Sequence, residues 1–241
     1  FMGNVSVVGA AILRGFGVDA RSIPTHTSLG QEMARKHIST EVCHPLKGVA
    51  GDILAFLTEE TKDKGADFVK DKYLIMMPTT SGPCRLGKYA EVVREFLDNE
   101  DMSEIPVVGP SSKSDYIDMP FPEDVGLSGK MAFQRVLFRA VKACDLLEDT
   151  FLRFRPYAAD KAQVDQLRRD CLSSLEKVLE KGGEIPALVE WGHETVSCFR
   201  AVRPSRMNVF PWSYTWERFT CASMIPRPGM SSTGWKILDW S

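Results

Sequence analysis

The chain has 241 residues, of which 44% are hydrophobic and 26% are charged, and its formal net charge is −2. These ordinary values indicate a globular protein, and the slightly acidic balance argues against nucleic acid or an anionic membrane as the main partner. No apolar run approaches the ~20 residues of a membrane-spanning helix, and no signal-peptide pattern opens the chain. We therefore predict a soluble, cytoplasmic protein. Because Phe1 precedes Met2, we expect the sequence to be a piece of a longer reading frame.

The first half of the chain alternates predicted helices with short predicted strands. Apolar periodicity and capping residues predict helices over residues 5–16, 31–37, 47–57 and 89–97. Strands are predicted over residues 20–23, 73–77 and 107–108. The run Tyr-Leu-Ile-Met-Met at 73–77 is typical of a strand that is buried on both faces in a parallel sheet. Strand, helix and strand in succession predict a right-handed βαβ unit. We therefore expect an α/β domain over residues 1–129, a Rossmann-like three-layer fold with parallel strands.

The second half is predicted to be mainly helical. Residues 113–130 contain proline and glycine without a clear period, which indicates an exposed connection. Three amphipathic helices follow over residues 130–154, 161–181 and 185–202, and they make up a helical segment that ends at 204.

Residues 205–241 differ in composition from the rest. Four of the five tryptophans lie in this stretch, which has only two carboxylates and no sustained period. It is either an irregular aromatic tail that packs on the body or an out-of-frame stretch of the gene. We place no site there.

Six cysteines are spread through the chain without any Cys-x-x-Cys pair, which argues against both a disulfide framework and a self-contained zinc knuckle. Cys144 and Cys171 lie on apolar helical stripes, and Cys198 lies among helical apolar residues. We expect these three to be buried in the core, because free cysteine is among the most buried residue types. Cys221 belongs to the atypical tail.

Cys43 and Cys84 are instead predicted to lie in loops directly before helices. A thiol at a helix N-terminus is favoured as thiolate by the helix dipole, and Arg85 and Lys88 add positive charge near Cys84. Loops at the carboxyl ends of parallel strands also bind ligands in open α/β sheets. Three interpretations of the pair remain open: ligands of part of an iron–sulfur cluster, a reversible thiol–disulfide couple, or incidental thiols of a metal-free scaffold or interaction domain.

Two motifs carry a resemblance to a known family. The sequence STEVCHP at 39–45 and the sequence MPTTSGPCRLGKY at 77–89 resemble the acyl-CoA dehydratase activase-related family, which is similar to the iron–sulfur subunits of 2-hydroxyacyl-CoA dehydratases. The resemblance extends over residues 2–204 and includes VVGPSS at 107–112. The chain departs from the family pattern at His44, Leu86 and Lys88.

The resemblance implies that Cys43 and Cys84 are metal ligands of an iron–sulfur cluster, 4Fe-4S or related, in low-potential electron transfer. The third cysteine of the dehydratase subunits and the ATP-binding activase module have no counterpart here, so the site is incomplete and the chain alone is not expected to be an active enzyme. The implied partners are an activase ATPase module or dehydratase subunits, and a homo-oligomer is an option.

Three further residues are candidates for contact with the cofactor: Arg85, Ser111 and Ser112. The two serines follow a predicted strand and can donate hydrogen bonds to a cluster sulfur or a phosphate, although a plain turn is the alternative. His44 is a candidate metal ligand beside Cys43, with polar surface as the alternative. If both cysteines serve one site, we expect their sulfurs to lie within about 8 Å of each other.

Overall fold

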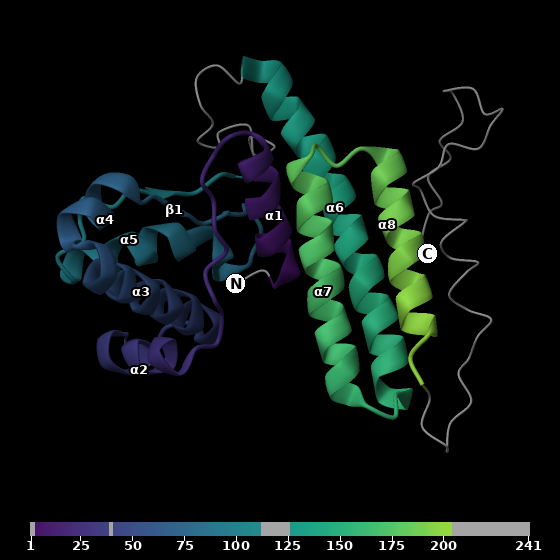
Figure 1. Ribbon diagram of the computed structural model, residues 1–241. Helices are drawn as coiled ribbons and strands as arrows, with labels where there is room; N and C mark the ends of the chain where they lie inside the picture. The colour runs from purple at the N-terminus through teal and green to yellow at the C-terminus, as the bar shows by residue number, and fades with distance from the viewer. Residues whose placement is uncertain (1–2, 39–40, 112–125, 204–241) are drawn as a thin grey trace. The chain divides into compact units, whose positions relative to one another are not determined.

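The computed structural model describes residues 3–38, 41–111 and 126–203 (Figure 1). Within these ranges 72% of the residues are helical. The chain divides into two compact units. The first contains Phe1–Cys144 and Leu172–Glu184, and the second contains Asp145–Cys171 and Ile185–Ser241. The division passes through two helices, α6 (Gly126–Phe154) and α7 (Lys161–Glu180), which contribute to both units.

Helices α2 (Ser28–His37) and α3 (His44–Lys64) form a closely packed hairpin in the first unit. Thr27 is the N-cap of α2, and its hydroxyl accepts a hydrogen bond from the amide of Gly30 at 2.9 Å. A Cβ atom on Gly51 would lie 2.1 Å from the carbonyl oxygen of Gly30. Glycine at position 51 therefore allows the two helices to approach this closely.

A parallel pair of short strands lies in the same unit. Strand β1 (Ile75–Met76) pairs with β2 (Val107–Val108) in the register Ile75 to Val107. The pairing continues beyond the strands, because the amide of Thr79 donates to the carbonyl of Pro110 at 2.9 Å. Helix α5 (Tyr89–Asn99) connects the two strands in the chain and packs against β2. The predicted succession of strand, helix and parallel strand is therefore confirmed.

The prediction of a Rossmann-like three-layer domain is wrong. The described residues contain this one sheet of two strands and are otherwise mainly helical. Residues 20–23, expected to form a strand, have no regular secondary structure. The run at 73–77 is also not buried on both faces: Ile75 and Met77 are buried, whereas Leu74 is 42% exposed. A run of apolar residues shows that a strand can form, but not how many other strands will pair with it.

The core around the sheet is built mainly by one face of each neighbouring helix. Helix α4 (Ala66–Lys72) contributes Val69, and α5 contributes Tyr89, Val93 and Leu97 at the spacing of a single helical face. The other buried apolar side chains of this cluster come mainly from α2, α3 and β1; the partly buried Cys43 packs against it. The beginning of α5, and with it the site described below, is therefore fixed by packing.

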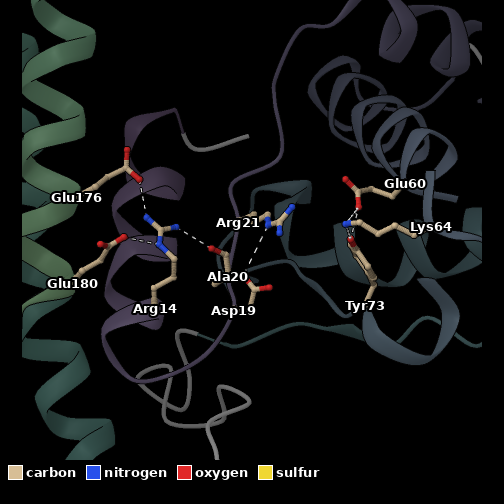
Figure 2. A network of polar contacts seen from close by, with 9 residues as sticks. All are labelled: Arg14, Asp19, Ala20, Arg21, Glu60, Lys64, Tyr73, Glu176 and Glu180. Carbon is tan, nitrogen blue, oxygen red and sulfur yellow. Dashed lines mark hydrogen bonds and ion pairs between the residues drawn. The ribbon is translucent and has the colours of Figure 1, made fainter. Parts of the chain in front are cut away.

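Helix α1 (Asn4–Gly15) packs against the end of α7 within the first unit. Gly15 comes so close that a Cβ atom there would lie 2.9 Å from the carbonyl oxygen of Glu180. The guanidinium of Arg14 donates to Glu176 at 2.8 Å and to Glu180 at 2.6 Å, and it also binds the carbonyl of Ala20 (Figure 2). A separate cluster in the same view joins Glu60, Lys64 and Tyr73.

The second unit consists of the C-terminal half of α6, the first half of α7 and α8 (Ile185–Arg200), with the short 3-10 helix η4 (Arg155–Tyr157). The rings of Phe154 and Phe199 pack with centroids 6.1 Å apart. The indole of Trp191 donates to the carbonyl of Cys171 at 3.1 Å. All three long helices were predicted to within a few residues, although α6 begins at Gly126, inside the stretch predicted as a connection.

Two further sequence-based expectations concern the tail and the absence of a membrane-spanning helix. The tail at 205–241, including Cys221, lies outside the described residues. Among the described helices, none is both long enough and apolar enough to cross a membrane.

Candidate functional site

Cys43 occupies the N-cap position of α3, as the sequence predicted. Its carbonyl accepts a hydrogen bond from the amide of Lys47 at 3.2 Å, which begins the helix, and Pro45 lies in the first turn. The thiol does not cap the helix with a side-chain hydrogen bond. It is half-buried and packs against the hydrophobic cluster around the sheet. The Cys43 sulfur is thus held by the core while its backbone starts the helix.

Cys84 is exposed and lies in the loop that follows β1. Helix α5 begins at Tyr89, as predicted, and the four residues between Cys84 and α5 form a 3-10 helix, η1 (Arg85–Lys88), which the sequence did not predict. The loop is compact: a Cβ atom on Gly87 would lie 2.4 Å from the carbonyl oxygen of Thr80. Glycine at position 87 lets the loop fold back on itself.

Tyr89, the first residue of α5, interacts with Cys43 through a hydrogen bond and with Cys84 through its charge. Its hydroxyl lies 3.3 Å from the sulfur of Cys43, within hydrogen-bonding distance, and its side chain is buried, with 4% of the residue exposed. Burial raises the pKa of Tyr89 to about 12, and the hydrogen bond with Cys43 and the charges of Cys43 and Cys84 act in the same direction. The phenol therefore stays protonated at neutral pH, and either the phenol or the Cys43 thiol can donate the hydrogen bond between them.

Three of the predicted site residues affect the pKa of this phenol. Both thiols influence the pKa of Tyr89, and so does the guanidinium of Arg85, which lowers it. Of these three residues, Cys43 contacts the hydroxyl directly, whereas Cys84 and Arg85 act on it through their charges. Sequence reasoning missed Tyr89. The available signal was an aromatic residue on the buried face of a helix that begins just after the Gly-Pro-Cys loop.

The predicted serines have different outcomes. Ser111 is half-buried and forms an isolated parallel bridge with Thr79, so it lies at the carboxyl end of the strand pair. Ser112 lies outside the described residues. Among the charged candidates, His44 is the exposed first residue of α3, and Lys88 forms an ion pair with Glu91 at 2.7 Å.

The prediction that three helical cysteines are buried in the core is confirmed for two of them. Cys144 and Cys171 are buried, as predicted. The prediction for Cys198 is wrong, because this residue is exposed. The buried residues of α8 include Leu188, Thr195 and Phe199, at helical spacing, and Cys198 lies about a quarter of a turn away from that face.

The donor atoms at the site suit a soft metal centre but do not complete one. Two thiols are the ligand type that iron–sulfur clusters take, and such clusters usually need four ligands. Within residues 3–38, 41–111 and 126–203 no group of three or more histidine, cysteine, aspartate or glutamate side chains is arranged to hold a metal ion. Further ligands would have to come from elsewhere.

Comparison of the chain with protein-family models, with curated proteins and with solved structures found no match.

Proposed function

We propose that Cys43 and Cys84 provide two thiolate ligands of an iron–sulfur cluster, 4Fe-4S or related, in a low-potential electron-transfer protein of the acyl-CoA dehydratase activation system. The observation that supports this most directly is that one phenol interacts with both thiols: its hydroxyl is 3.3 Å from the Cys43 sulfur, and the charge of Cys84 raises the pKa of the same hydroxyl. Two thiols that act on one buried hydroxyl are a suitable start for a shared ligand set.

The surrounding residues would tune such a centre. Tyr89 would donate a hydrogen bond to the Cys43 sulfur, and Arg85 would place a positive charge close by. Hydrogen bonds and positive charge near ligand sulfurs stabilise the reduced, more negative state. A bound cluster would supply the exchange of single electrons, while the chain holds the sulfurs, donates the hydrogen bond and shields one side by packing.

The ligands that residues 3–38, 41–111 and 126–203 do not provide would come from partners under this proposal. A second copy of this chain would add two further cysteines, and a dehydratase subunit would add its own. The proposed source of driving force is ATP hydrolysis in an activase module or partner. In isolation the chain is therefore proposed to bind a cluster weakly or as a homo-oligomer, without enzymatic turnover.

Anaerobic reconstitution with iron and sulfide tests this function. We expect iron and acid-labile sulfide to bind to the unaltered chain, and Cys43→Ala or Cys84→Ala to lose most of the iron. Cys198→Ala is the matched control, because this cysteine is exposed but belongs to another helix. Iron content unchanged in both Cys43→Ala and Cys84→Ala would contradict the proposal.

A thiol-redox function is the second candidate, and the exposure of Cys84, which an oxidant can reach, favours it. In that case mild oxidation would remove two free thiols and link residues 43 and 84, as peptide mapping would show, without iron in the protein. A metal-free scaffold would show neither iron binding nor this disulfide.

A further inference from the structure

A hollow of about 520 Å³ lies between α1, the N-terminal half of α6 and the end of α7, all within the first unit. Three of its lining side chains are buried and apolar. Ile12 and Leu179 are each 1% exposed, and Val136 is 8% exposed. Phe16 also lines the hollow, and its ring packs edge-on against that of Phe133, with centroids 6.1 Å apart. These buried side chains therefore belong to the well-packed core.

Two guanidinium groups line the same hollow. Arg135 and Arg139 are four residues apart on α6, so they lie on one face of the helix. Among the described residues neither arginine forms an ion pair; Arg135 donates only to the carbonyl of Met131, at 3.3 Å. Like charges at this spacing destabilise a helix, and an anion between them would remove that repulsion. One carboxylate, that of Glu184, also lines the hollow, and in the described part of the chain it has no ion-pair partner either.

We propose that this hollow binds a small amphipathic monoanion, with its apolar body on Ile12, Val136 and Leu179 and its carboxylate at Arg135 and Arg139. Ligand pockets are typically several hundred Å³ in volume, mostly apolar, with a few polar groups that fix the orientation. Guanidinium groups bind carboxylates through paired, charge-assisted hydrogen bonds. The negative charge of Glu184 disfavours a second anionic group on the ligand.

Octanoate is the probe, with the full chain titrated by calorimetry below the concentration at which octanoate forms micelles. We expect one saturable site, and no binding of octylammonium, which has the same apolar body and the opposite charge. Arg135→Gln and Arg139→Gln should each weaken octanoate binding roughly tenfold or more, because each removes charged hydrogen bonds. Lys142→Gln is the matched control, since Lys142 lies on the same helix over the ring of Phe138, outside the hollow.

A second variant tests whether the apolar body of the ligand occupies the hollow. Ala132→Trp would fill the hollow from its α6 side and leave both arginines in place, so it should abolish binding. Circular dichroism and thermal unfolding identify any variant that fails to fold, and the arginine variants then carry the test. Absence of saturable octanoate binding, or binding equally tight in the folded arginine variants, would overturn the proposal. The outcome is independent of the cysteine site, because Cys43→Ala leaves every residue of the hollow intact.

Discussion

The carboxylate of Asp52, on α3, accepts two hydrogen bonds from Thr27, one from its amide at 3.1 Å and one from its hydroxyl at 3.0 Å. It also accepts the amide of His26 at 2.9 Å, and Asp52 is only 7% exposed. Because Thr27 is the N-cap of α2, this buried carboxylate fixes the start of one helix to the middle of another. His26 is held at a positive φ of 59° in the same turn.

Replacement of Asp52 by alanine should lower the free energy of unfolding by about 2 kcal/mol, because three partly buried hydrogen bonds to this buried carboxylate are lost. Chemical denaturation monitored by circular dichroism measures this. The control is Asp63→Ala on the same helix, which removes an exposed carboxylate and should change stability by less than about 0.5 kcal/mol. Equal effects of the two substitutions would show that the Asp52 hydrogen bonds contribute little.

Two glycines of α1 provide a matched test of close packing. Gly9→Ala should stabilise the protein by about 0.5–1 kcal/mol, because a Cβ atom there meets nothing within 4 Å and alanine favours helix. Gly15→Ala should instead destabilise it by about 1–3 kcal/mol, because its Cβ atom would lie 2.9 Å from the backbone of Glu180. Thermal unfolding of both variants checks the signs. A stabilising Gly15→Ala would mean that α1 and α7 are farther apart than described.

Tyr89 should make stability fall at high pH. Its pKa is about 12 in the folded chain, against 10.0 for an ordinary tyrosine. Below pH 10 the Tyr89 phenol is protonated in both the folded and the unfolded chain, so its contribution to the free energy of unfolding is fully present. Between pH 10 and 12 the phenol of the unfolded chain loses its proton first, and the free energy of unfolding therefore falls. The resulting loss is about 2 kcal/mol.

The comparison of wild type with Tyr89→Phe removes the contribution of the groups that do not interact with this phenol. Denaturant unfolding at several pH values should give a smaller stability difference at pH 12 than at pH 9. A difference that stays constant over this range would show that the phenol is not perturbed.

Thiol reactivity should follow burial. Cys84 and Cys198 are exposed and should be alkylated first, whereas Cys144 and Cys171 are buried and should react at least about tenfold more slowly at neutral pH. Burial also raises the pKa of Cys171, which lowers its thiolate fraction further. Mass spectrometry of peptides after timed alkylation resolves each site. Rapid labelling of Cys171 in the folded chain would contradict its placement in the core.

The sequence alone determined the local features of this protein. Most helix positions, the two paired strands and the placement of Cys43 immediately before α3 follow from periodicity, proline, glycine and capping residues within short windows, whereas α4 and the full length of α3 were not predicted. These features depend on neighbouring residues and so can be read without knowledge of the fold. The burial of Cys144 and Cys171 could be predicted for the same reason.

Tertiary structure decided the rest. The number of strands in the sheet, the exposure of Cys198 and the contact between Cys43 and Tyr89, 46 residues apart, depend on which surfaces meet in three dimensions. Periodicity shows that a segment has an apolar face, but it does not identify the partner of that face. The Rossmann-like prediction failed for this reason: two of the three strand signals were correct, but the described chain covers the strand pair with helices instead of adding further strands.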